Sequence, residues 1–127
     1  MVDLEEQITK ATTLRDLGVI LECLFNRGYD VDRQGRLCID FVEIAQVKGL
    51  TIEIHHREHP PPHFHVSGSD VDASFAIVSG QFLNGKIGPR HRRLVKWWHQ
   101  RARMTLIDLW NQTRPSDCAV GPIAYDG

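Results

Sequence analysis

Three consecutive prolines at positions 60–62 constrain the fold most, because proline cannot donate a hydrogen bond to a sheet or continue a helix. Residues 50–56, just before them, alternate between apolar and polar. The alternation resumes at 63–66 and again at 71–78, with Gly68 as the turn between the two segments. Short alternating segments separated by turn residues indicate an antiparallel β-meander at the centre of the chain.

A helical segment is predicted before this meander. Thr13 and Asp16 resemble a capping box, and the leucines that follow recur at helical spacing until Gly28, a residue suited to end a helix. A shorter helix is expected over residues 3–11. A turn at 32–35 then leads into a first strand.

A second helix is predicted after the meander. The glycines of residues 80–89 indicate a loop, and Pro89 suits the first turn of a helix. Apolar residues then recur every three or four positions for about six turns, until Pro115. The predicted class is therefore α+β: an antiparallel β-meander with a long C-terminal amphipathic helix packed on it, preceded by an N-terminal helical segment.

We expect one compact domain in three parts: an N-terminal helical extension with the first strand (1–48), the α+β domain proper (49–114) and a flexible tail (115–127). The 127 residues contain no apolar run of 18, which predicts no transmembrane helix and no membrane partner. The acidic N-terminus is unlike a signal peptide, and the three cysteines are widely spaced. A cytoplasmic location is expected.

The formal net charge of −1 conceals a strongly basic segment. Residues 86–114 carry eight lysines and arginines against Asp108 alone, a balance of +7, whereas residues 1–45 carry nine acids against five bases. A basic block of this kind favours a nucleic-acid backbone or an acidic protein as partner. The alternative is that the basic face of this helix complements the charge of the acidic first half of the same chain.

The densest chemistry lies in residues 54–65, which hold five of the seven histidines. If 63–66 is extended, His63 and His65 share one face while Phe64 enters the core. Imidazole titrates near neutral pH, so one ring can accept a proton while another donates one. Cleavage of RNA by its own 2′-hydroxyl needs such a pair and a cation for the phosphate. For any single histidine, a structural hydrogen bond to the backbone is the alternative.

The same histidines suggest zinc as an alternative. No cofactor is predicted for the acid–base reaction, but a zinc site could use His59, His63 and His65, because zinc takes imidazole ligands and its sites have three or four ligands from the protein. A further ligand would come from His55, His56 or Asp70.

The strand before the prolines carries a second candidate pair. Glu53 and His55 lie two residues apart on its polar face, so they are a candidate carboxylate–imidazole pair. Plain exposure to solvent is the alternative. No arrangement of the Ser–His–Asp type can be argued from spacing alone.

The histidine–proline segment is similar to the signature H-x-P-P-H-F-H of a family of small bacterial proteins catalogued as a domain of unknown function. The rest of the family pattern follows in order: an alternating strand, a G-x-x-L-x-G turn and a helix with two tryptophans twelve residues apart. The resemblance covers roughly residues 50–113. The matching positions are His59, Pro61, Pro62, His63, Phe64, His65, Gly85, Trp98 and Trp110.

This resemblance implies a small cytoplasmic protein of a prokaryote and the toxin of a toxin–antitoxin pair. The expected partners are a small antitoxin-like protein, RNA and a second copy of the chain in a homodimer. Residues 1–48 exceed the family's usual short leading strand. This extension is therefore expected to carry a role of its own, such as dimerisation or partner binding.

Two functional hypotheses result. In the first, a toxin-like ribonuclease uses His63 and His65 as acid and base, with His59 as a third member. In the second, a non-catalytic regulatory module binds nucleic acid or an acidic protein through the basic helix. Trp97 lies about 100° round that helix from Trp98, among arginines, which suits base stacking or the edge of a core. The candidate nucleic-acid-binding residues are Arg57, Arg90, Arg92, Arg93, Lys96, Trp97 and Arg101.

Overall fold

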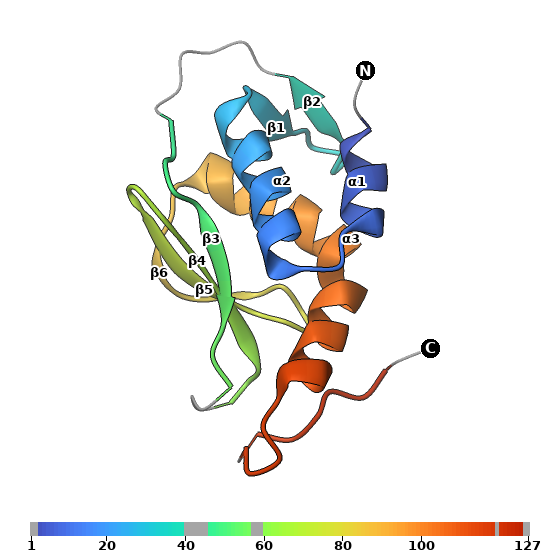
Figure 1. Ribbon diagram of the computed structural model, residues 1–127. Helices are drawn as coiled ribbons and strands as arrows, with labels where there is room; N and C mark the ends of the chain where they lie inside the picture. The colour runs from blue at the N-terminus through green and yellow to red at the C-terminus, as the bar shows by residue number, and fades with distance from the viewer. Residues whose placement is uncertain (1–2, 40–45, 57–59, 119, 126–127) are drawn as a thin grey trace.

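A four-stranded antiparallel sheet carries helices on one of its faces (Figure 1). The structure, a computed structural model, describes residues 3–39, 46–56, 60–118 and 120–125. The predicted α+β class is confirmed. In chain order the elements are α1 (Leu4–Lys10), α2 (Leu14–Asn26), β1 (Tyr29–Val31), β2 (Leu37–Ile39), β3 (Thr51–Ile54), β4 (His63–Gly68), β5 (Val71–Ala76), β6 (Phe82–Lys86) and α3 (Pro89–Thr113).

The helices begin and end where local sequence signals predict. The hydroxyl of Thr13 accepts a hydrogen bond from the backbone N–H of Asp16 at the start of α2. Pro89 opens α3, and the helix ends at Thr113 with Arg114 as its C-cap, just before Pro115. None of the described helices combines the length and the apolarity needed to cross a bilayer.

The sheet has the order β3-β4-β5-β6, so the predicted meander is confirmed with two corrections. The first concerns the turn between β4 and β5. Gly68 was expected to make this turn, but it still pairs with Val71, and Ser69 and Asp70 form the turn instead. Asp70 adopts a positive φ of 61°, a conformation that its short polar side chain tolerates.

The second correction concerns residues 80–89, which were expected to be a loop but contain β6. Gly85 has a φ of +114°, and a Cβ added there would lie 2.2 Å from the carbonyl oxygen of Asp72 on β5. The glycine that suggested a loop is therefore what lets β6 approach β5. Pairing with the preceding strand, β5, outweighs the weak local preference of this segment.

The core lies between the sheet and the helices. Phe64 of β4 is stacked on Phe75 at 5.5 Å and lies 5.6 Å from Trp98 of α3. The indole N–H of Trp98 donates to the carbonyl oxygen of Leu17 in α2. This hydrogen bond joins α3 to α2, so both helices lie in one layer against the sheet.

A second, smaller layer covers the far side of α3. It consists of α1 and the β1–β2 hairpin, which both contact α3. Trp97 was predicted to lie outside the apolar stripe, but it is only 5% exposed. The guanidinium of Arg101 lies 3.9 Å from the centre of its ring. Trp97 therefore belongs to the core edge, the alternative that the sequence left open, and does not present a face for base stacking.

The C-terminal segment runs back along the end of α3 (Figure 1). The indole N–H of Trp110 donates to the carbonyl oxygen of Gly121 at 3.2 Å. The side chain of Asn111 bonds to both backbone groups of Ile123. Composition predicted a flexible tail here, yet these contacts are specific and involve side chains of α3.

Candidate functional site

The two faces of β4 differ as the sequence predicts. Phe64 and Val66 are fully buried on the helix side. His63 and His65 alternate with them and lie on the opposite, helix-free face of the sheet. The ring centroids of these two histidines are 5.0 Å apart, so the predicted histidine pair is brought together.

Strand register adds two residues that the sequence analysis did not identify. His65 lies opposite Ser74 of β5, and Ser74 lies opposite Asn84 of β6. On the other side, His65 lies opposite Glu53 of β3. Residues paired across a sheet point to the same face, so a polar row crosses all four strands.

A pocket of about 290 Å³ lies at this row, and we call it the histidine pocket. Its walls come from the β3–β4 connection, from β4 and β5, and from β6. The residues that line it are Pro60, Pro61, His63, His65, Ser74, Leu83 and Asn84.

Hydrogen bonds at Nδ1 orient both histidines of the pocket. Nδ1 of His63 lies 2.9 Å from the carbonyl oxygen of Pro61. A carbonyl can only accept, so we assign the proton of the neutral ring to Nδ1, which makes Nε2 the nitrogen that accepts a proton. Nδ1 of His65 lies 3.1 Å from the hydroxyl oxygen of Ser74, which can donate or accept.

His55 extends the cluster beyond the pocket. Its Nε2 lies 2.8 Å from a carboxylate oxygen of Glu53, so the predicted carboxylate–imidazole pair is present. Its ring lies 4.6 Å from that of His65. Arg57 and His59, which the sequence predicts to bind nucleic acid and to take part in catalysis, lie outside the described residues.

His56 has a structural role instead. Its Nε2 lies 3.2 Å from the carbonyl oxygen of Trp110 and 3.0 Å from the hydroxyl of Thr113. Its ring packs on Trp110 with centroids 4.6 Å apart. His56 therefore fastens the residues just before the histidine pocket to the C-terminal end of α3.

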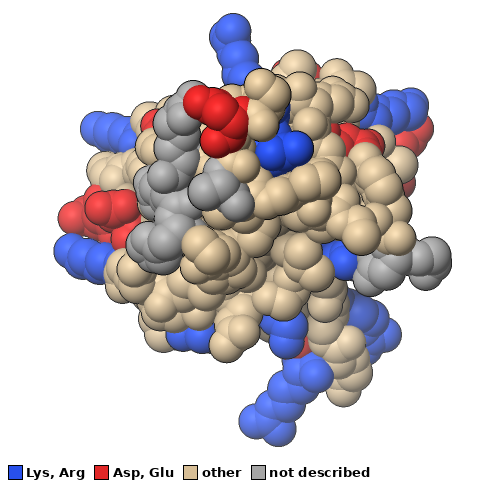
Figure 2. Space-filling model, turned by 90° about the horizontal axis from the view of Figure 1, so that it is seen from below, with Lys and Arg blue, Asp and Glu red and all other residues tan. Residues whose placement is uncertain are grey.

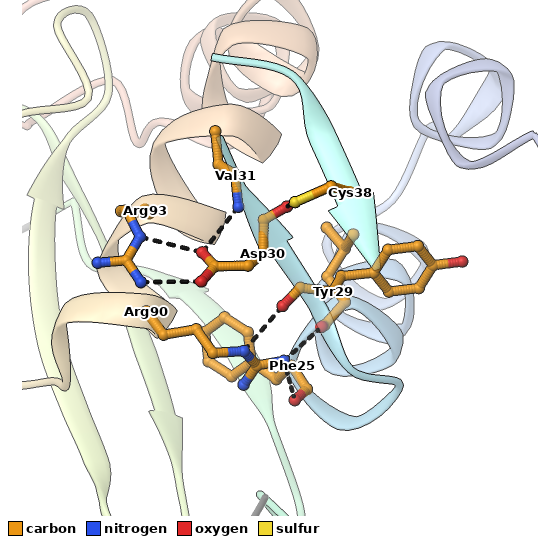
Figure 3. Close-up of polar contacts among 8 residues, drawn as sticks. Phe25, Tyr29, Asp30, Val31, Cys38, Arg90 and Arg93 are labelled. Carbon is orange, nitrogen blue, oxygen red and sulfur yellow. Dashed lines mark hydrogen bonds and ion pairs between the residues drawn. The ribbon is translucent and has the colours of Figure 1, made fainter. Parts of the chain in front are cut away.

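Three of the arginines predicted to bind nucleic acid bond to the protein itself. Arg90 donates to the carbonyl oxygens of Tyr29 and Phe25, and Arg93 forms a two-point ion pair with Asp30 (Figure 3). The hydrogen bonds from Arg93 hold the pKa of Asp30 below its ordinary value, and they raise the pKa of Arg93. The third is Arg101, which pairs with Glu5.

These contacts correct the predicted combined site. Arg90 and Arg93 lie among α2 and β1 on the helix side of the sheet, whereas His63 and His65 lie on its open face. The structure therefore does not bring these arginines to the histidine pair. At the end of the molecule that holds the β3–β4 connection, Lys and Arg side chains stand mostly around the margin (Figure 2).

The remaining candidates on α3 stay exposed. Arg92 lies 4.4 Å from the ring centre of Phe82, and Lys96 follows one turn later on the same helix. Both line a hollow of about 550 Å³ beside β6 and the start of α3.

Among the described residues, no group of three or more His, Cys, Asp or Glu side chains is arranged to hold a metal ion. The alternative zinc site includes His59, which lies outside them. The zinc alternative therefore stays a prediction, and its test is the metal content of protein purified without a histidine tag.

Ser74 and Asn84 are the site residues that sequence reasoning missed. Ser74 occupies a polar position of an alternating strand. The sequence therefore indicates on which face of the sheet Ser74 lies, but not which residue it pairs with. Asn84 lies in the segment that was expected to be a loop. Only the register of β5 with β4 and β6 places Ser74 beside His65 and Asn84 beside Ser74.

Comparison with known proteins supports the resemblance noted in the sequence. Residues 49–111 match the family described as "Domain of unknown function (DUF4160)". Searches of curated proteins and of solved structures gave no match. The matched segment begins just before β3 and ends within α3, so it contains the whole sheet and every described residue of the histidine pocket. Residues 49–111, about half of the chain, are thus similar to the DUF4160 family, and the described residues of the histidine pocket lie within this segment.

Proposed function

We propose that this protein cleaves RNA in the histidine pocket by acid–base catalysis, as the toxin-like component of a bacterial toxin–antitoxin pair. The observation that carries the proposal is the pair of imidazoles in one pocket, with centroids 5.0 Å apart and each oriented at Nδ1. Cleavage by the 2′-hydroxyl of RNA needs a base, an acid and a cation for the phosphate. Imidazoles supply the first two near neutral pH, and the sequence offers Arg57 for the third.

The hydrogen bonds suggest a role for each ring. His63 carries its proton on Nδ1, so its Nε2 takes the proton from the 2′-hydroxyl. The 2′-oxygen attacks phosphorus, and the bond from phosphorus to the 5′-oxygen breaks. A protonated His65 then gives its proton to the leaving 5′-oxygen. The products are a 2′,3′-cyclic phosphate and a 5′-hydroxyl.

The test compares His63→Asn and His65→Asn with the wild-type protein on a fluorogenic RNA. Asparagine keeps a hydrogen-bonding group near Nδ1 but removes Nε2, so each variant is expected to fold and to lose at least about a hundredfold in rate. Gln112→Ala, on the exposed end of α3, is the control. Growth arrest on induction is expected for the wild type and the control only. RNA cleavage that survives both histidine substitutions would contradict the proposal.

The second candidate is a non-catalytic module that binds nucleic acid through α3. It is favoured by the exposure of Arg92 and Lys96, four residues apart on one helix face. Replacing both by alanine is expected to weaken binding to single-stranded RNA and to reduce the slope of log affinity against log salt by about 1.4. An acidic protein as partner would instead show binding that changes less with salt.

A further inference from the structure

We infer that the histidine pocket holds a nucleobase, with Asn84 hydrogen-bonded to its edge and with Pro61 and Leu83 against its faces. This inference deepens the proposed function and rests on it for the choice of a nucleotide as ligand. It assigns substrate recognition to residues that take no part in the proton transfers.

The lining of the pocket combines apolar and hydrogen-bonding groups, as a nucleobase does. Pro60, Pro61 and Leu83 are apolar, whereas Ser74 and Asn84 offer hydrogen-bonding groups. A nucleobase likewise has two apolar faces and a polar edge, and proteins recognise single-stranded RNA by packing on the faces and bonding to the edge. The volume of about 290 Å³ lies at the lower end of small-ligand pockets, which suits one nucleotide unit.

An irregularity in β6 turns Leu83 toward the pocket. Ser74 pairs with Asn84, but its neighbour Phe75 pairs with Phe82, so Leu83 is an extra residue in the strand. Such bulges re-aim a side chain. Leu83 is 38% exposed and lines the pocket on an otherwise polar face, where it adds nothing to the core. A ring that packs against it would account for its position.

Asn84 supplies the recognition group. It is exposed at the pocket wall, and no described residue hydrogen-bonds to its side chain. Its amide presents a donor beside an acceptor, the pattern that matches N6 and N7 of adenine.

The charge of the lining also favours a base over a phosphate. The described residues of the pocket include no lysine, arginine, aspartate or glutamate. Phosphate recognition relies on cations and on clustered backbone N–H groups, whereas a neutral ring needs neither. The described lining therefore suits the neutral base of a nucleotide.

The experiment is a titration of the purified full-length chain, followed by amide NMR, with adenosine 3′-monophosphate and with ribose 5-phosphate. The adenosine nucleotide is expected to bind and to shift the signals of β5 and β6, and ribose 5-phosphate to bind at least about tenfold more weakly. Asn84→Ala should weaken nucleotide binding about tenfold, the effect of a lost hydrogen bond. Leu83→Ser should weaken it too, and Gln112→Ala should not.

Three outcomes would overturn the inference: equal binding of both ligands, unchanged nucleotide binding by Asn84→Ala, or no nucleotide binding. Its failure is distinct from a failure of the proposed catalysis. If the nucleotide binds as expected but both histidine variants cleave RNA like the wild type, the base site stands and the catalytic proposal falls. If cleavage depends on the histidines but Asn84→Ala binds the nucleotide normally, the catalytic proposal stands and the base site falls.

Discussion

The open face of the sheet holds a pocket lined by polar side chains, whereas the first turns of α3 hold two arginines whose guanidinium groups bond to other elements of the fold. His63 and His65 line the histidine pocket. Arg90 and Arg93 are as conspicuous in the sequence, yet they bond to residues of α2 and β1. A dense run of charge therefore does not identify a binding surface. What matters is how much of each side chain's hydrogen-bonding capacity the fold already uses.

The histidines outside the open face repeat this contrast. His91 is stacked on Phe25 with ring centroids 4.1 Å apart. His99 is 3% exposed and lies 2.6 Å from the carbonyl oxygen of Ile77, to which its Nε2–H donates. Burial lowers the pKa of both. Burial thus favours the neutral form of these two rings, whereas His63, itself only 6% exposed, and His65 line the histidine pocket.

The largest effect on stability is expected for Arg90→Ala. Arg90 donates to three carbonyl oxygens, two of them at the C-terminal end of α2. Removing it should lower the free energy of unfolding by about 2–3 kcal/mol, because charged hydrogen bonds are lost and the helix end loses its cation. The matched variant Arg92→Ala, on an exposed residue, should change it by less than about 0.5 kcal/mol. Equal urea midpoints for the two variants would show that Arg90 stabilises the fold no more than the exposed Arg92 does.

Local signals made most of the helical part of this fold predictable. Thr13 and Pro89 mark helix starts by chemistry that acts within one turn. Trp97 was left open between base stacking and the core edge because its burial depends on elements far away in the chain. It faces away from the sheet, but α1 and the β1–β2 hairpin cover that side as well.

The candidate site was predictable only in part, for the same reason. His63 and His65 share a face because residues two apart in a strand always do. Ser74, Asn84 and the pairing of Arg93 with Asp30 depend instead on register and on packing between segments. No spacing within one element contains that information.

A smaller effect is expected from the titration of His99. Because burial lowers its pKa in the fold, the unfolded chain takes up the proton first as pH falls below about 6.5. Stability should therefore fall with decreasing pH in that range, by at most about 1.4 kcal/mol per pH unit for this group, and level off below the folded pKa. His99→Gln keeps a donor for Ile77 and does not titrate, so urea unfolding from pH 7 to pH 5 should show a shallower loss. A slope equal to that of the wild type would show that His99 is not a buried neutral group.

The smallest effect is expected from the ion pair that ties α3 to β1. Arg93 makes two hydrogen bonds to Asp30, of 3.0 and 2.9 Å, but its own side chain is half exposed. Water and salt screen such a pair, so a double-mutant cycle with Asp30→Asn and Arg93→Gln should give a coupling of about 0.5–1 kcal/mol at pH 7. The pKa of Asp30 is lowered in the fold, chiefly by the hydrogen bond from Arg93. The coupling should therefore be complete above the unfolded pKa of about 3.9 and disappear as pH falls through the lower folded value. Coupling that persists at pH 2 would mean that packing, and not charge, joins the two residues.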